Sequence, residues 1–192
     1  GFLLTALGFR PALFAMAIGL VIILVGSSLS LPGELGRSKA KRKFSRLFSK
    51  TRDVNVISAA RFFLFGARDI WFVVGVPVFL SVDLGWGFTE VGSFLALWVI
   101  GYGVVQSAAP AIIRHWTVGR APQGRSAQVL AFILAGLTGL VAAGVMTGRA
   151  PTAIVLGGLA LFGVVFAMNS SVHSYLILAY SDGDEVAANV GF

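Results

Sequence analysis

The sequence contains no cysteine among its 192 residues. This absence excludes disulfide bonds, thiolate metal ligands and a cysteine nucleophile. Charged side chains are also scarce, at 12% of the residues, whereas a soluble domain has about 25%. No Walker A loop, HExxH, GxSxG or cluster of metal ligands is present in the sequence. We therefore expect no resident metal or cofactor and no enzymatic activity.

Apolar residues, by contrast, are in excess. They make up 57% of the chain, and its mean hydropathy is +0.88. A helix of about 20 apolar residues crosses the roughly 30 Å of hydrocarbon in a bilayer, so we predict an all-α polytopic membrane protein with lipid as its solvent. The predicted elements are a partial span at 1–7, a tight turn at 8–11, complete spans at 12–31, 56–82, 90–113, 127–146 and 152–180, and a further span beginning near Val186.

The net charge of +7 comes mainly from one segment, because eight of the fifteen basic residues lie between Arg37 and Arg52. Basic residues gathered in a loop between apolar spans mark a cytoplasmic loop, and they are weak support for a nucleic-acid partner. The loop Arg114–Arg125 is also basic, and the loops that alternate with these two are not. We predict that both basic loops are cytoplasmic and that Trp86 and Trp116 lie near opposite membrane faces.

Polar side chains divide the predicted spans into two kinds. The spans 12–31 and 127–146 are almost entirely apolar, so we expect them to face lipid. The other three complete spans should face the bundle interior or an aqueous cavity, because ionisable groups are costly in hydrocarbon. Their polar residues of interest are Arg61, Arg68 and Asp69 in the first, Tyr102 and Gln106 in the second, and Asn169 and His173 in the third.

Arg68 and Asp69 lie near the middle of their predicted span. Each charge placed there costs about 2.5–3.5 kcal/mol of insertion free energy, which something must offset. The pair either neutralises itself or serves transport, with Arg68 binding a substrate and Asp69 carrying a proton. Arg61 lies two helical turns earlier on the same face. It is either a second cation of one cavity or a side chain whose charged end reaches the membrane surface.

The other two polar-lined spans carry weaker signals. Trp98, Tyr102 and Gln106 recur at intervals of four and so share a helix face, which indicates either packing or a binding surface. Asn169 and His173 also share a face. An imidazole titrates near neutral pH, so His173 is a candidate for anion binding or proton relay, and equally for an interhelical hydrogen bond.

The order of spans, with two polar-lined spans between two apolar ones and a long basic loop after the first, resembles the major facilitator superfamily. That resemblance implies a fragment of a twelve-helix bundle, from the end of span five to the start of span eleven. Residues 1–31 would end the N-terminal half, and 32–54 would form the central cytoplasmic loop. Residues 55–192 would supply four full spans of the C-terminal half and the start of a fifth.

Three stretches resemble, within that superfamily, the ArsJ group of organoarsenical efflux permeases: FSKTRDVNVISAARFFLFGARDIWFVVGVPVFL (48–80), GWGFTEVGSFLALWVIGYGVVQSAAP (85–110) and NSSVHSYLILAYSDGDEVAANVGF (169–192). This resemblance implies a bacterial inner-membrane permease that confers arsenate resistance. Its substrate would be an arsenate ester of phosphoglycerate, made when a glyceraldehyde-phosphate dehydrogenase uses arsenate, and protons are a possible coupling ion.

A small anionic substrate needs cations and hydrogen-bond donors near the bilayer midplane. The candidate substrate-binding residues are Arg68, Arg61, Tyr102, Gln106, Asn169 and His173, with Asp69 as the candidate proton carrier. The alternatives are a permease for another organic anion or a drug and, from a different class, a membrane sensor without transport activity or a membrane-embedded enzyme.

Overall fold

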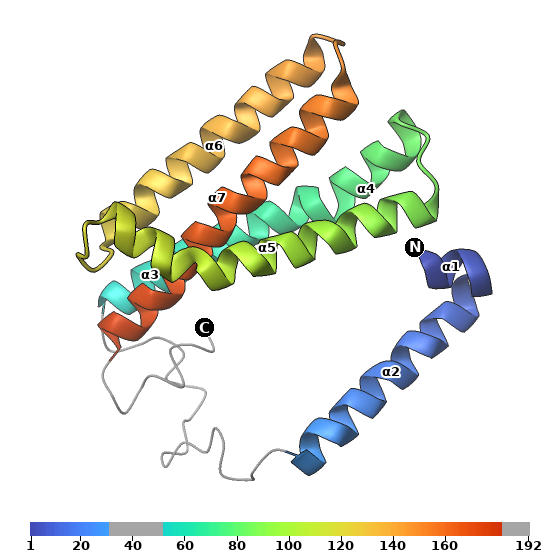
Figure 1. Ribbon diagram of the computed structural model, residues 1–192, viewed down its shortest axis with the longest axis horizontal. Helices are drawn as coiled ribbons and strands as arrows, with labels where there is room; N and C mark the ends of the chain where they lie inside the picture. The colour runs from blue at the N-terminus through green and yellow to red at the C-terminus, as the bar shows by residue number, and fades with distance from the viewer. Residues whose placement is uncertain (31–51, 182–192) are drawn as a thin grey trace.

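The computed structural model describes residues 1–30 and 52–181, and within these ranges it contains helices and no strand (Figure 1). Five helices are long and apolar enough to cross a membrane. The prediction of an all-helical protein with several candidate membrane spans is therefore confirmed at this level. The elements are α1 (Phe2–Leu7), α2 (Phe9–Ser30), α3 (Arg52–Asp69), η2 (Ile70–Gly75), α4 (Val76–Val78), η3 (Phe79–Asp83), α5 (Phe88–Trp116), α6 (Gly124–Met146) and α7 (Pro151–Tyr180).

Helix boundaries differ from the predicted ones where breaking residues were given too much weight. The tight turn predicted at 8–11 is reduced to Gly8, whose φ of 78° lies in the left-handed region, and α2 begins at Phe9. Pro11 is tolerated because amide groups in the first turn of a helix have no intrahelical partner to lose. Similarly, α3 begins at Arg52, inside the loop predicted for 32–54.

The segment from Arg52 to Asp83 is one helix of 32 residues, but its winding is not uniform. Two π-helical stretches, η2 and η3, flank the short α4 that contains Pro77. Proline removes one backbone donor, and in a membrane helix local changes of winding satisfy the carbonyl that is left over. Arg68 and Asp69 lie immediately before the first wide turn, midway along this helix.

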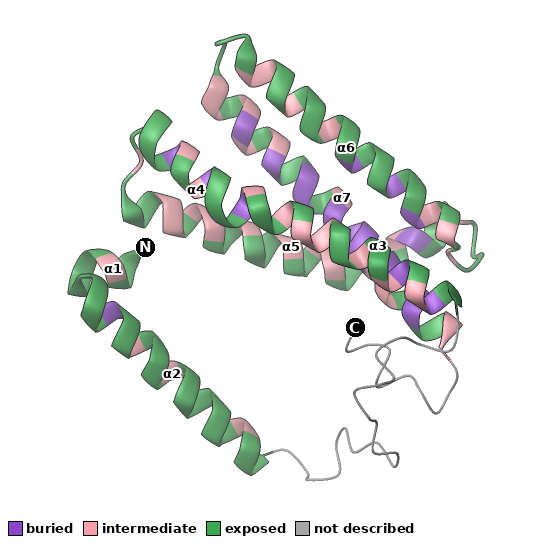
Figure 2. Cartoon of the chain, turned by 180° about the vertical axis from the view of Figure 1, so that it is seen from behind, coloured by how far each residue is buried: buried purple, intermediate pink, exposed green. Residues whose placement is uncertain are grey.

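Helix α7 forms the centre of the bundle and packs against α3, α5 and α6. Figure 2 shows buried positions along its length and mostly exposed positions on the outer faces of α6 and α2. On α6 the buried residues are Ala127, Leu130 and Leu134, whose spacing of three and four places them on the face toward α7. Phe132 on the opposite face is 79% exposed. Exposed apolar faces of this kind suit contact with lipid.

Helix α2 lies apart from this bundle (Figure 1). Helix α1 touches the start of α5, where the Thr5 and Thr89 hydroxyls are 2.9 Å apart. In α2 only Ala12 is buried. Its remaining surface is open for lipid or for further helices.

The loop between α5 and α6 and the start of α3 lie at one end of the bundle, and the α6–α7 turn lies at the other (Figure 1). Trp86 precedes the start of α5 and Trp116 ends it; that the two lie near opposite membrane faces stays a prediction. Most of the predicted basic loop 32–54 and the span predicted near Val186 lie outside the described residues.

The orientation of the bundle can be tested with single cysteines, because the chain has no cysteine of its own. If the basic α5–α6 loop is cytoplasmic, a cysteine at Gln123 should resist an impermeant thiol reagent in intact cells, and a cysteine at Arg149 should react. Permeabilised cells provide the control, because both positions should then be labelled. Labelling of Gln123→Cys from outside would reverse the predicted orientation.

Candidate functional site

Arg68 and Asp69 form an ion pair midway along the α3–η3 helix. The Arg68 Nε donates to Asp69 Oδ1 at 2.7 Å, and a terminal guanidinium nitrogen contacts the same oxygen. The Arg68 side chain is 21% exposed and that of Asp69 is 50% exposed. Arginine has five N–H donors, and two of them serve Asp69. The pair therefore satisfies itself only in part, because the remaining donors are available to a further acceptor.

An aromatic platform holds the two arginines on one face of α3, as their spacing predicted. The guanidinium carbons of Arg61 and Arg68 lie 5.3 and 5.0 Å from the centroid of the Phe65 ring. Arg68 also lies 5.0 Å from the centroid of Phe166 on α7. Such cation–π contacts strengthen when the cation is desolvated, and they leave the guanidinium edge free for an anion.

The stripe on α5 faces α7, and much of it serves packing. The Trp98 indole N–H donates to the Leu159 carbonyl at 2.8 Å, and its ring stacks on Tyr102 at 5.7 Å between centroids. The Tyr102 ring also lies 5.9 Å from that of Phe166. Tyr102 thereby borders the same aromatic platform as Arg68.

Gln106 joins α5 to α7 one turn farther along. Its side-chain amide donates to Ser170 Oγ at 3.4 Å, and the Ser171 hydroxyl donates to the Gln106 backbone carbonyl at the same distance. This side chain therefore has a structural partner within the chain.

Asn169 and His173 line a different space, a cavity of about 380 Å³ enclosed by α3, α6 and α7. They are 0% and 3% exposed, yet Asn169 Nδ2, Asn169 Oδ1 and His173 Nδ1 have no hydrogen-bond partner among the described residues. Gln128 and Arg125 of α6 line the same cavity. A buried polar group without a partner costs about 1–3 kcal/mol, so a polar molecule that hydrogen-bonds these atoms from the cavity would offset that cost.

The candidate residues therefore fall into two groups at successive levels along α7, because Phe166 lies one to two turns before Asn169 and His173 on nearly the same helix face. Arg61, Arg68, Asp69 and Tyr102 surround the aromatic platform of Phe65 and Phe166, and Asn169 and His173 belong to the cavity toward α6. No cluster of three or more potential metal ligands occurs within 1–30 and 52–181.

Sequence reasoning missed the two phenylalanines and the contribution of α6. Phe65 lies four residues after Arg61 and three before Arg68, a spacing that places all three on one helix face. The position of Phe65 beside both arginines could therefore have been predicted from the sequence. Phe166, Arg125 and Gln128 come from other helices. Only the packing of α6 and α3 on α7 brings them to these places.

The unpartnered amide leads to a prediction about stability. Asn169→Leu removes both orphaned atoms and keeps the branched arrangement of four side-chain heavy atoms, with the adjoining cavity to take the added volume, so we expect the free energy of unfolding to rise by about 1–2 kcal/mol. Thermal unfolding of the purified protein in detergent measures the change. Met168→Leu is the matched control, because it exchanges buried apolar side chains and should change stability little. A loss of stability in Asn169→Leu would show that the amide has a partner in the folded protein.

Comparisons with protein-family models, with curated proteins and with solved structures return no match to this chain.

Proposed function

We propose that this chain is part of a secondary active transporter of the major facilitator type that exports a small organic anion. The observation that carries the proposal is Arg68, a cation held midway along a candidate span with N–H donors left over after its pairing with Asp69. An intramembrane cation with spare donors suits a substrate that brings its own negative charge.

The chemistry around Arg68 favours an anion over a cation. Arg61 adds a second positive charge on the same aromatic ring, and Asp69 is the one acidic residue between Asp53 and Asp83. Tyr102 borders the same aromatic platform and supplies a hydroxyl group that can donate to an oxyanion. A cationic drug would meet repulsion from both arginines.

The arsenated phosphoglycerate is the substrate we propose, on the strength of the resemblance to the ArsJ group. A glyceraldehyde-phosphate dehydrogenase that uses arsenate would supply this ester, and its export would confer arsenate resistance. Its phosphate, arsenate and hydroxyl oxygens are acceptors for planar guanidinium groups, which bind such oxygens in pairs.

We propose that Asp69 couples proton movement to transport of the anion. The carboxylate occupies two Arg68 donors and is half exposed, so a proton on Asp69 and a substrate anion on Arg68 both weaken the ion pair, and each favours the binding of the other. Protonation of Asp69 frees Arg68 for the anion, and deprotonation restores the ion pair and expels the anion. The two halves of the bundle would rock around the site between these states.

Transport into everted membrane vesicles tests the proposal directly. Vesicles carrying the full-length protein receive glyceraldehyde 3-phosphate, its dehydrogenase, NAD and arsenate outside, and arsenic retained inside is measured by mass spectrometry. We expect accumulation that needs every component and an imposed proton gradient. Vesicles without the protein are the control. Uptake that persists when glyceraldehyde 3-phosphate is omitted would contradict the organoarsenical, and no uptake under any condition would favour a sensor or another substrate.

A further inference from the structure

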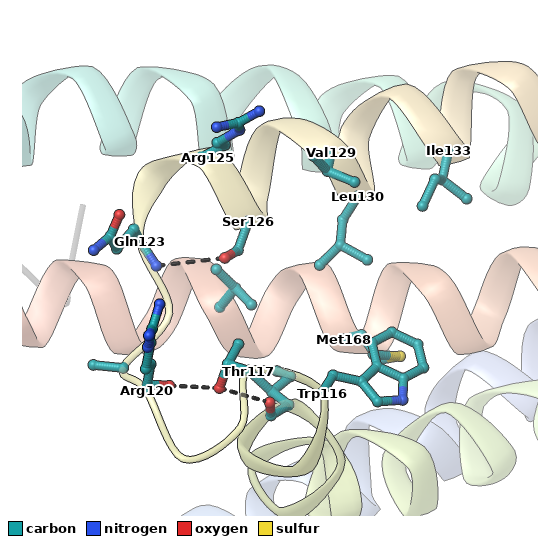
Figure 3. A pocket seen from close by; sticks show the side chains of 13 residues that line it. Trp116, Thr117, Arg120, Gln123, Arg125, Ser126, Val129, Leu130, Ile133 and Met168 are labelled. Atoms are coloured by element: carbon teal, nitrogen blue, oxygen red, sulfur yellow. Dashed lines mark hydrogen bonds between the residues drawn. The ribbon is translucent and has the colours of Figure 1, made fainter.

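A second cavity lies at the end of the bundle where α5 turns into α6, away from the aromatic platform. Its volume is about 490 Å³, and α5, α6, α7 and the loop between α5 and α6 line it. Figure 3 shows polar side chains, among them Arg120, Gln123 and Ser126, gathered at the loop end. Val129 and Ile133 follow along α6 toward the middle of the bundle. The cavity is therefore polar at its outer end and apolar along its length.

The loop end of this cavity carries positive charge that nothing in the described part of the chain neutralises. Arg114, Arg120 and Arg125 lie in a segment without any acidic residue, and the ion pair found among the described residues joins Arg68 to Asp69 instead. Arg120 also lines the neighbouring cavity of about 320 Å³ together with Arg114. Two arginines therefore border this adjoining cavity.

The backbone holds Arg120 in place. Val118 and Gly119 both adopt positive φ, 52° and 77°, and the Gly119 amide donates to the Arg114 carbonyl at 2.8 Å. The Thr117 hydroxyl bridges the Ile113 and Arg120 carbonyls. A non-glycine residue in the left-handed region is uncommon and is kept only where its surroundings require it. This turn is a defined structure that positions Arg120 at the cavity mouth.

Trp116 marks the depth of the cavity in the membrane. It ends α5, lines the cavity and is 65% exposed. Tryptophan concentrates at the boundary between headgroups and hydrocarbon. The arginines then lie at headgroup level, and the apolar part of the cavity lies at the level of the acyl chains.

We propose that this cavity binds one anionic phospholipid. Its phosphate binds Arg120, helped by the positive N-terminal end of the α6 dipole, and one acyl chain lies along Val129 and Ile133. A polar mouth with unpaired cations above an apolar groove matches the two ends of a lipid. Free phosphate would use only the mouth, and a zwitterionic lipid would bring no net charge. Basic pockets between helices are known to select acidic headgroups in this way.

Quenching of Trp116 fluorescence by brominated lipid tests the proposal. The purified full chain is placed in phosphatidylcholine nanodiscs that contain a minor fraction of phosphatidylglycerol, and either lipid carries bromine on its acyl chains. The difference between the wild-type protein and Trp116→Phe isolates the Trp116 signal from the other tryptophans. We expect brominated phosphatidylglycerol to quench Trp116 more strongly than brominated phosphatidylcholine at equal mole fraction.

Single substitutions test which arginine causes the preference for phosphatidylglycerol. Arg120→Gln should reduce the preference for phosphatidylglycerol about fivefold, as expected for one basic residue near a membrane surface, whereas Arg120→Lys should retain most of it. Arg149→Gln, at the opposite end of the bundle, is the matched control and should leave the preference unchanged.

Three results would overturn the proposal. Equal quenching by the two lipids would exclude headgroup selection. If the preference for phosphatidylglycerol survives Arg120→Gln, or falls equally in Arg149→Gln, then Arg120 does not bind the headgroup. Relief of quenching by inorganic phosphate, at matched ionic strength, would show a site for free anions instead of a lipid.

Discussion

Arg68→Gln is expected to reduce export to the level of vesicles without the protein, while the chain still inserts and folds. Glutamine keeps some hydrogen bonding but loses the positive charge that the proposed anion needs. The variant also leaves Asp69 without its partner. Uptake by vesicles measures transport, and expression with size-exclusion chromatography in detergent establishes that the fold is intact.

Arg68→Lys separates charge from geometry at the same position. Lysine retains the charge, but it lacks the planar fork that binds two oxygens and stacks on aromatic rings. In this protein it would replace the stacking of a planar guanidinium on Phe65 and Phe166 by the weaker contacts of a compact ammonium. We expect impaired but measurable export, at least tenfold below wild type.

A double variant distinguishes substrate binding from simple neutralisation. If Arg68 only compensates Asp69, then Arg68→Gln combined with Asp69→Asn leaves no unpaired charge and should be far milder than Arg68→Gln alone. If Arg68 binds the substrate, the double variant should be as inactive as the single one. Near wild-type export by the double variant would refute the substrate role of Arg68.

Phe166→Ala is expected to have the second largest effect, on both stability and transport. Phe166 is fully buried, and its ring packs against those of Phe65, Tyr102 and Phe162 at 5.2–5.9 Å between centroids. Lipid offers no strong hydrophobic gain for burial, so the loss is mainly the cavity term, about 2 kcal/mol of unfolding free energy. The Arg68 guanidinium would also lose one of its two supporting rings.

Phe132→Ala is the matched control for Phe166. It makes the same chemical change on α6, where the ring is largely exposed and faces away from α7. The unfolding temperature in detergent should therefore be close to that of the wild-type protein, and export should persist. Equal losses in the two variants would indicate that Phe132 packs against a further helix.

Much of the helical organisation followed from hydropathy, because a run of about 20 apolar residues has few alternatives to a helix in lipid. The periodicity of 3.6 residues also placed Arg61 and Arg68 on one face, and the ring of Phe65 beneath both agrees with it. The π-helical winding around Pro77 was not predictable, since it depends on how the backbone near a proline recovers its hydrogen bonds.

The candidate site was likewise predictable from the sequence only in part. Sequence alone identified the polar residues in the spans, because charges and amides stand out where the surrounding residues are apolar. It could not tell that Gln106 has a partner in Ser170 or that both amide atoms of Asn169 have none within the described residues. Those differences depend on which helices meet, and helices with apolar faces on several sides have many possible neighbours.

The sequence by itself determined that the chain consists of membrane-type helices and which side chains carry charge or polarity within them. The reason is that length and hydropathy suffice to fix a helix in hydrocarbon. Only the tertiary structure decided that α7 is the central helix, that Phe166 supports Arg68, and that Asn169 and His173 open into a separate cavity with α6. These are contacts between residues far apart in the chain, and close packing of specific side chains selects them.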